Sequence, residues 1–241
     1  MSRNPPIPNL GNEPFKTDSA SPQAPTNSPY GFQNRGYGSH QAISNLVRPG
    51  TDVLDVGCAS GYLRAHLRDS KECQCVGIEP NRESAMAGQS RGLNIVIDDA
   101  LSGISSLAPT ARFDHIIFGD VLEHLIDPMT VLNASRDLLR PSGSLIVSLP
   151  NIVSLHARAT IALGIWRYHE AGIFDKSHLR FFSVKTGREL LCDATYRITQ
   201  EEFVGPLTFW GGRRLKSVIK LRPNLLANQM VFSAVPIIPT A

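Results

Sequence analysis

The chain has 241 residues, of which 42% are hydrophobic, so it can bury one sizeable core, and we expect a single domain. Its formal net charge of +3 is too small to indicate a nucleic-acid-binding protein. No stretch reaches the roughly 18 apolar residues of a membrane span, and the N-terminus lacks the layout of a secretory signal, so we expect a cytoplasmic protein.

The first 29 residues are rich in Pro, Ser and Asn and contain few large apolar side chains. Burial cannot offset the entropy lost when such a segment is ordered, so residues 1–29 are predicted to be a disordered tail and residues 30–241 the folded domain. From Tyr30 to His40 the sequence YGFQNRGYGSH mixes aromatic residues with glycines. This composition indicates either a flap that closes over a bound cofactor or an ordinary loop.

Short apolar runs rich in β-forming residues then alternate with amphipathic helical segments. This is the βαβ pattern of an α/β fold, with a parallel sheet covered by helices on both faces. The turn sequences RPG and LRPSG are predicted to precede the first and the fifth strand. The five strands are expected over 51–57, 75–79, 94–98, 113–120 and 144–150.

Beyond Pro150 this alternation changes. Helices are expected over about 152–163 and 184–194, strands over 196–205 and 228–235, and a short basic helix between the two strands. We expect the segments 151–182 and 205–224 to form a cap that binds the substrate that accepts a transferred group, called the acceptor below.

The second cap segment carries a run of basic residues, and residues 151–241 hold 12 Lys and Arg against 6 Asp and Glu. The run can attract a phosphate-bearing acceptor, including one at a membrane surface, or it can be a solvated helix face. Its members are Arg213, Arg214, Lys216, Lys220 and Arg222.

The first predicted strand ends in LDVGCASGYL, a turn whose small residues let backbone amides approach a ligand. A dinucleotide-binding GxGxxG motif would place its third glycine at Tyr62, whereas here the glycine is Gly61, which disfavours a dinucleotide. Glu79 ends the second strand, where a carboxylate can accept hydrogen bonds from both hydroxyls of a ribose. Its spacing from the turn suits NAD as well, so Glu79 indicates only that a nucleoside is bound. Alternatively, Glu79 is a surface carboxylate without a ligand.

The turn resembles the DxGxGxG loop of class I S-adenosylmethionine-dependent methyltransferases, with Ala59 in place of the middle glycine. The run FDHIIFGDVLEHLIDP is similar to their FDxIxxxDVLEHLxDP pattern, and the resemblance covers about residues 37–235. GIFDKSHLRFF resembles a segment of the methyltransferases of sugar, glycan and natural-product biosynthesis. There is further similarity to MetW-like proteins, through SLPN, and to ubiquinone-type O-methyltransferases.

The resemblance implies a Rossmann-like, doubly wound sheet of seven strands, mostly parallel with an antiparallel last strand, and a helical cap. It implies S-adenosyl-L-methionine as cofactor, with Asp99 or Asp98 near the adenine amino group and Gly119 and Asp120 beside the sulfonium. The complete set of expected cofactor-binding residues is Asp55, Gly57, Cys58, Ala59, Gly61, Glu79, Pro80, Asp98, Asp99, Ala100, Gly119 and Asp120.

Methyl transfer is an in-line displacement at a carbon that the sulfonium already activates, so the protein has to align the acceptor and exclude water, and we expect no metal. An alcohol acceptor must also lose a proton, commonly to a histidine or a carboxylate. His178 is the first candidate base, with a structural histidine as the alternative, and His124 is the second. Asp175 and Glu123 are the carboxylate alternatives.

These observations favour an O-methyltransferase acting on a sugar or another small hydroxylated metabolite, with or without phosphate, in glycan or natural-product biosynthesis. Members of the subgroup carry His and Trp where this chain has Ser154 and Leu155, so their acceptor contacts do not carry over. N- or C-methylation stays open, as does the oligomeric state. An NAD-linked oxidoreductase and a non-catalytic methyltransferase-like binding protein are the alternatives. We expect no nucleic-acid partner and at most peripheral membrane contact.

Overall fold

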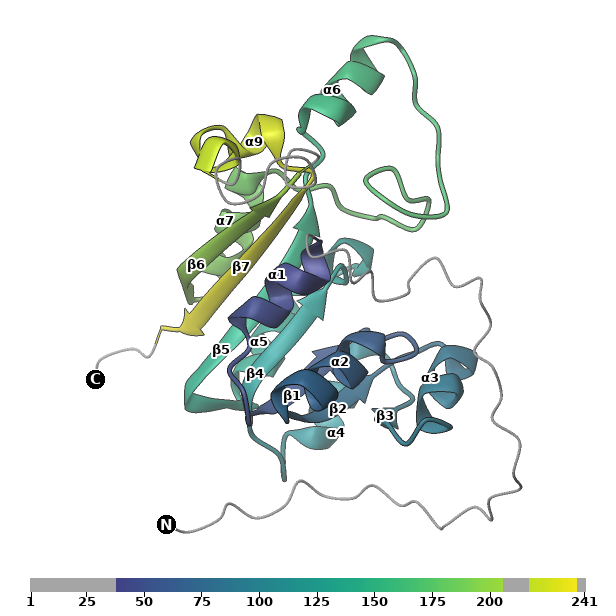
Figure 1. Cartoon of the computed structure of the whole chain (residues 1–241), viewed down its shortest axis with the longest axis vertical. Helices are drawn as coiled ribbons and strands as arrows, with labels where there is room; N and C mark the ends of the chain where they lie inside the picture. Colours follow the sequence, from purple (N-terminus) through teal and green to yellow (C-terminus); the bar gives the residue numbers. More distant parts are fainter. Residues whose placement is uncertain (1–37, 206–216, 238–241) are drawn as a thin grey trace.

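The computed structural model describes residues 38–205 and 217–237, which form a seven-stranded sheet with the order β3-β2-β1-β4-β5-β7-β6 (Figure 1). The first five strands are parallel to one another, and β7 runs antiparallel to both β5 and β6. This is the predicted Rossmann-like sheet with its antiparallel last strand. The strands are β1 (Asp52–Val56), β2 (Gln74–Ile78), β3 (Asn94–Val96), β4 (Phe113–Gly119), β5 (Leu139–Pro150), β6 (Tyr196–Val204) and β7 (Gln229–Pro236).

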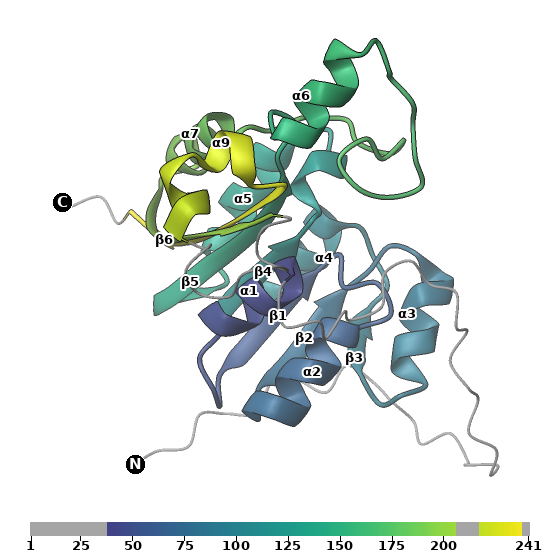
Figure 2. The same cartoon turned by 45° about the horizontal axis from the view of Figure 1, so that its top comes forward.

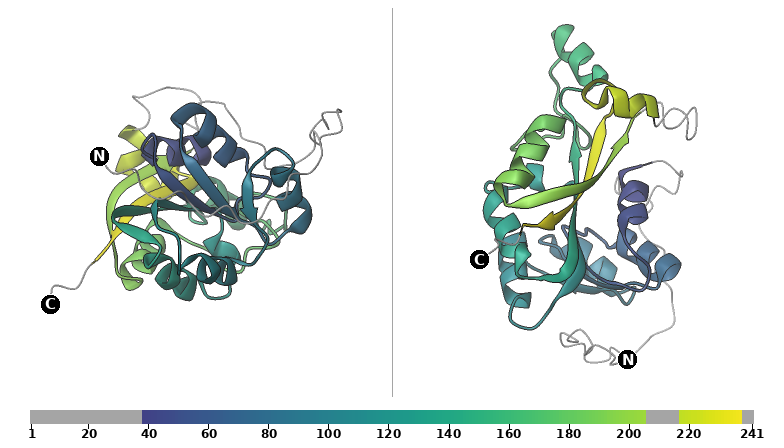
Figure 3. Two further views of the ribbon diagram at one scale, coloured as in Figure 1. Left: turned by 90° about the horizontal axis from the view of Figure 1, so that it is seen from below. Right: turned by 90° about the vertical axis from the view of Figure 1, so that its left-hand side faces the viewer.

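Helices cover both faces of the sheet, with α1 and α2 on one side and α4, α5 and α7 on the other (Figure 3). No helix in the described part of the chain is long and apolar enough to cross a bilayer. The helices are α1 (Ser39–Leu46), α2 (Tyr62–Lys71), α3 (Arg82–Gln89), α4 (Ala100–Leu107), the 3-10 turn η1 (Leu122–His124), α5 (Pro128–Arg136), α6 (Leu155–Ala162), α7 (Val184–Asp193) and α9 (Pro223–Leu226).

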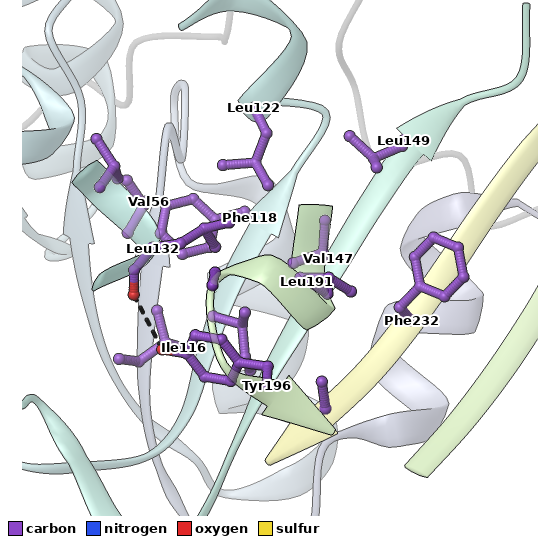
Figure 4. Close-up of a cluster of buried hydrophobic side chains, with 14 of the residues drawn as sticks. Val56, Ile116, Phe118, Leu122, Leu132, Val147, Leu149, Leu191, Tyr196 and Phe232 are labelled. Atoms are coloured by element: carbon purple, nitrogen blue, oxygen red, sulfur yellow. Dashed lines mark hydrogen bonds between the residues drawn. The ribbon is translucent and has the colours of Figure 1, made fainter. Parts of the chain in front are cut away.

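The alternation of side chains along the strands separates the core into two layers. In β1, Leu54 and Val56 face the layer beneath α4, α5 and α7, whereas Val53 packs with α1 and α2. Figure 4 shows the first layer, in which the Tyr196 hydroxyl donates to the carbonyl oxygen of Leu132 at 3.0 Å. Because both faces are covered, the strands read as nearly continuous apolar runs.

The helix starts follow their capping residues. Asp127 accepts a hydrogen bond from the Thr130 amide at the start of α5, and Pro128 occupies the first turn, where its missing N–H costs nothing. A capping box between Ser183 and Thr186 begins α7. The capping box explains why the predicted start of the helix over 184–194 agrees with α7.

One local prediction was wrong. LRPSG does not form a turn before β5, because Leu139 already pairs with Phe113 and the register shifts before Ser144 pairs with His115. The segment expected to be a flap or loop gives way to helix α1 at Ser39. Residues 1–37, with the predicted tail and most of that flap, and Arg213, Arg214 and Lys216 of the basic run lie outside the described residues.

The predicted cap consists of α6 and the loop over 163–182, which project beyond the carboxyl end of β5 (Figures 1 and 2). Its two ends meet at the sheet, where the Ile152 amide donates to the carbonyl oxygen of Phe182 at 2.9 Å. Asn151, fully buried, donates from Nδ2 to the carbonyl oxygen of Ala227 at 2.8 Å. From the second cap segment, Lys220 pairs with Glu202 at 3.7 Å.

At the opposite end of the sheet, Arg140 of β5 binds two carboxylates from neighbouring strands, Asp52 at 2.5 Å and Asp114 at 2.6 Å. All three side chains are less than a quarter exposed. We expect Arg140→Met to lower the free energy of unfolding by about 1–2 kcal/mol, because two charge-assisted hydrogen bonds are lost while two carboxylates stay close together. Urea unfolding measures this change. The more exposed Arg188, paired with Glu201, provides the control, and an equal or larger loss for Arg188→Met would contradict the assignment.

Candidate active site

A cavity of about 640 Å³ opens at the carboxyl ends of the parallel strands, where open α/β sheets bind their ligands. Its volume lies in the range of about 300–1,000 Å³ that small-molecule sites occupy. Loops after β1, β2, β3 and β4 form one part of its wall, and helix α1, the cap loop and single residues of α2, β5 and β7 complete it. Most of the predicted cofactor-binding residues line it, namely Gly57, Ala59, Glu79, Pro80, Asp99, Ala100, Gly119 and Asp120.

The loop after β1 is held in a conformation that requires glycine at Gly57. Its φ is +71°, and a Cβ there would lie 2.5 Å from Cγ2 of Val121. The amides of Gly57 and Cys58 both donate to the carbonyl oxygen of Ile78, which fixes the loop to β2. Ala59 also has a positive φ of 48°, so an alanine occupies a left-handed position that glycine adopts more readily.

Glu79 is the carboxylate at the end of β2 and is 8% exposed. Its Oε2 accepts a hydrogen bond from the Ala59 amide at 2.8 Å, and its Oε1 accepts one from the Asn81 amide at 2.8 Å. Each oxygen keeps a further acceptor position, since a carboxylate offers about four. The side chain therefore lies in the cavity wall in a fixed orientation, with capacity for two more donors.

The two acids after β3 differ in their placement. Asp99 lines the cavity and caps helix α4, accepting hydrogen bonds from the amides of Leu101 and Ser102 and from the Ser102 hydroxyl. The bond from the Ser102 amide is the main cause that lowers the pKa of Asp99. Asp98 does not line the cavity and accepts a hydrogen bond from the Asp99 amide. Of the two adenine candidates, the geometry thus favours Asp99.

Three predicted cofactor residues lie beneath the loop and do not line the cavity: Asp55, Cys58 and Gly61. A Cβ at Gly61 would lie 2.5 Å from Cδ1 of Leu93, so this glycine allows close packing. Cys58 and Asp55 are both buried near Arg64, whose guanidinium donates to backbone carbonyl oxygens of β2 and β3. Their positions support the loop from below.

Burial raises the pKa of Asp55 to about 7, although the charge of Arg64 opposes this shift. Because the pKa in the folded protein exceeds the value near 3.8 expected on unfolding, protonation of Asp55 favours the folded state. Its contribution to stability is complete below about pH 4 and is lost as the pH rises through about 7. The substitution Asp55→Asn should therefore weaken the pH dependence of the free energy of unfolding.

Between pH 5 and pH 8 we expect the free energy of unfolding to change by different amounts in the wild type and in Asp55→Asn. The wild type should lose about 2 kcal/mol relative to Asp55→Asn over this range. Urea unfolding at both pH values measures this difference, and the other titrating groups cancel because both proteins contain them. Parallel pH profiles for the two proteins would rule out the raised pKa.

Asp120, after β4, lies at the point where the ends of three strands meet. It has a φ of +57°, and its Oδ1 accepts hydrogen bonds from the Ser148 hydroxyl at 2.7 Å and from Nε2 of Gln229. Burial raises the pKa of Asp120. Gln229 lines the cavity but was not predicted, because only the insertion of β7 beside β5 brings it there. His40 of α1, from the segment expected to be a flap, is a second cavity residue without a predicted role.

The two predicted base candidates, His124 and His178, also line the cavity. Their rings lie 4.8 Å apart between centroids. Nδ1 of His124 bonds to the carbonyl oxygen of Ser177, and Nδ1 of His178 bonds to that of Ile173, each at 3.2 Å. Burial lowers the pKa of His178.

Glu123 lies beside this pair and is completely buried, yet it also lines the cavity. Its Oε1 is 4.0 Å from Nε2 of His178, and neither carboxylate oxygen has a hydrogen-bond partner among the described residues. Burial raises the pKa of Glu123 well above its ordinary value. Asp175, the other carboxylate alternative, lines the cavity too, but its Oδ1 accepts hydrogen bonds from the amide and hydroxyl of Ser177.

Solved structures with a similar fold include S-adenosylmethionine-dependent methyltransferases. One from Archaeoglobus fulgidus has a TM-score of 0.57 and 20% identity, covering 82% of this chain and 94% of that chain. The 1,6-didemethyltoxoflavin-N1-methyltransferase of Burkholderia thailandensis, solved with 1,6-didemethyltoxoflavin and S-adenosylhomocysteine, has a TM-score of 0.54 and 19% identity, covering 82% of this chain and 78% of that chain. The predicted class I methyltransferase fold is thus confirmed.

Relatives by sequence agree with this fold. A ubiquinone biosynthesis O-methyltransferase of Xanthomonas campestris pv. campestris is 30% identical over 111 residues, which are 45% of this chain and 46% of that enzyme. The bifunctional methionine biosynthesis protein MetXA/MetW of Rhodopirellula baltica is 26% identical over 176 residues, 68% of this chain and 28% of that protein. The chain thus spans less than half the length of either relative. The model of the methionine biosynthesis protein MetW family matches residues 38–234, so the chain belongs to the MetW family.

Proposed function

We propose that the protein is an S-adenosyl-L-methionine-dependent methyltransferase that O-methylates a sugar or another small hydroxylated metabolite. One observation carries this proposal. A single cavity has a nucleoside-binding wall around Glu79 and the Gly57 loop, and it has two histidines, His124 and His178, in another part of its wall. Cofactor and acceptor can therefore meet inside one cavity.

In this proposal the cofactor lies along the carboxyl ends of β1, β2 and β4. Glu79 accepts hydrogen bonds from the two ribose hydroxyls, and Asp99, with the backbone of Ala100, contacts the adenine. Gly119 and Asp120 flank the methionine part, near the sulfonium. Ser148 and Gln229 hold Asp120 in place, so these two residues act through it as positioning residues.

When bound, the cofactor supplies a methyl group that its sulfonium activates. The acceptor oxygen forms a bond to the methyl carbon while the carbon–sulfur bond breaks, and the hydroxyl proton leaves the acceptor. His178 or His124 is placed to take that proton, since both line the cavity. The protein contributes alignment of acceptor and cofactor, which alone can supply much of the rate enhancement.

Support for a hydroxyl acceptor comes from two sides. The Xanthomonas relative is named as an O-methyltransferase, and the segment GIFDKSHLRFF resembles methyltransferases of sugar and natural-product assembly. The histidines lie in the part of the wall that the cap loop helps to form. Acceptor walls on shared folds vary most in such loops, so the cap is where the acceptor class is decided.

The proposal is tested with S-adenosylmethionine labelled in its methyl group, incubated with separate pools of nucleotide sugars, free sugars and catechols. We expect labelled product in one hydroxylated pool, with one S-adenosylhomocysteine released per methyl transferred and a product mass consistent with an ether. A protein that binds the cofactor but methylates no pool would support the non-catalytic alternative. Reduction of NAD with any pool would support the oxidoreductase alternative.

A further inference from the structure

His124, His178 and Glu123 lie together in the cavity wall, and no hydrogen bond joins their side chains in the described part of the chain. The Nδ1 atoms of His124 and His178 each bond to a backbone carbonyl oxygen, which can only accept, so each Nδ1 carries the ring proton. Nε2 of each neutral ring is therefore a bare acceptor. One ring nitrogen of each histidine lies within 4.8 Å of a carboxylate oxygen of Glu123, and for His178 this nitrogen is Nε2, 4.0 Å from Oε1. The Glu123 carboxylate is buried and has no partner among the described residues.

An arrangement of two imidazole nitrogens and one carboxylate is unfavourable as it stands, because buried polar groups need partners of opposite character. A cation between them would satisfy all three. The ligand atoms of Glu123, His124 and His178 lie within 4.8 Å of one another. We propose that these three residues bind a divalent cation of the zinc type.

The chemistry of the donors points to zinc. Two imidazoles and one carboxylate are the ligands that zinc takes in catalytic sites, where it keeps a fourth position open. Hydrogen bonds from the far ring nitrogens to backbone carbonyl oxygens are the usual support of metal-binding histidines, since they fix the tautomer and the ring orientation. Both histidines here have that support.

The distances allow such a site. Around a tetrahedral zinc ion with bonds of about 2.0 Å, neighbouring ligand atoms are about 3.3 Å apart. Oε1 of Glu123 and Nε2 of His178, 4.0 Å apart, must therefore approach by about 0.7 Å, and no pair of ligand atoms has to approach by more than about 1.5 Å. Rotation of the Glu123 side chain can supply this approach, because no hydrogen bond holds either of its oxygens in the described part of the chain.

The fourth position of the ion would face the cavity, since all three ligands line it. There it can bind the hydroxyl oxygen of the acceptor and lower the pKa of that hydroxyl, which eases loss of its proton. This role rests on the proposed function, whereas binding of the ion does not. Sequence patterns do not indicate the site, because Glu123 and His124 lie far from His178 along the chain.

The test uses full-length protein stripped with a chelator and then titrated calorimetrically with zinc chloride, and separately with cobalt chloride, whose visible spectrum reports tetrahedral coordination. We expect one ion per chain, and each of the variants Glu123→Gln, His124→Asn and His178→Asn should bind zinc at least about tenfold more weakly. The matched control is His156→Asn on helix α6, which does not line the cavity and should bind zinc as the wild type does.

Binding of S-adenosylmethionine by the same stripped samples separates the two proposals. Stripped protein that binds the cofactor but no zinc would overturn the cation site and leave the methyltransferase proposal standing. Zinc binding that only the three ligand variants weaken, in protein that does not bind the cofactor, would support the site and refute the proposed function. Zinc binding that the three variants leave unchanged would also overturn the site.

Discussion

Glu79→Gln is expected to weaken S-adenosylmethionine binding about 10- to 100-fold, which corresponds to about 1.4–2.8 kcal/mol. The carboxylate of Glu79 has two acceptor positions directed to the cavity in addition to those used by the Ala59 and Asn81 amides. An amide at this position keeps the size of the side chain but replaces one oxygen with a donor. That change removes the charge-assisted bonds to the ribose hydroxyls and also disturbs one of the two backbone contacts.

Calorimetric titration of wild type and variant measures the effect. Glu79→Ala should weaken binding at least as much, because it removes both oxygens. Glu83→Gln is the matched control, since Glu83 lies exposed in the first turn of the neighbouring helix α3 and should leave the affinity unchanged. Equal cofactor affinities for wild type, Glu79→Gln and Glu79→Ala would remove the ribose assignment.

His178→Asn is expected to lower the turnover number about 10²- to 10⁴-fold, the range that a positioned acid–base group contributes. The affinity for S-adenosylmethionine should stay within a factor of about 2, because His178 lies in another part of the cavity wall from Glu79. The loss is expected whether His178 takes the acceptor proton itself or binds an ion that activates the acceptor. Metal titration separates those two roles.

The measurement is steady-state methyl transfer once an acceptor is known, with kcat and KM determined separately. His66→Asn provides the comparison because His66 lies on α2, outside the cap, and does not line the cavity. Full activity of His178→Asn would assign that histidine a structural role, namely the hydrogen bond from its Nδ1 to Ile173. Asp175 and His124 would then be the next candidates in the same wall.

Sequence patterns predicted the fold well because the parallel strands are buried on both faces and are separated by clear turn and capping signals. The expected strand at 51–57 corresponds to β1, and that at 113–120 to β4. The β5 start was missed because Leu139 joins the sheet ahead of a register shift that no local signal marks. Helix α1 was missed because its first residues, Ser39 and His40, follow a glycine-rich segment that reads as a loop.

The site was predictable where a motif corresponds to a loop at a strand end. Gly57, Glu79 and Asp120 line the cavity because the carboxyl ends of β1, β2 and β4 meet there. Asp55 does not, because its position within β1 turns its side chain into the buried side near Arg64. The place of Gln229 in the cavity wall could not be predicted, because it depends on the pairing of β7 with β5. A local sequence pattern does not contain this long-range information.

The grouping of Glu123 with His124 and His178 is of the same long-range kind. The Leu179 and Arg180 amides bind the carbonyl oxygen of Glu123 at 2.9 and 3.1 Å and so fix the cap loop against η1. Only this docking brings His178 to the carboxylate. The identities of the three residues were visible in the sequence, but their common location was not.

The central claim, a cavity that binds an adenosyl cofactor, is tested most directly by calorimetric titration of the purified chain with S-adenosylmethionine, S-adenosylhomocysteine and NAD in one buffer. The predicted result is micromolar or tighter binding of both adenosyl ligands and no binding of NAD. Binding of NAD alone would contradict the account, as would binding of none of the three by folded protein.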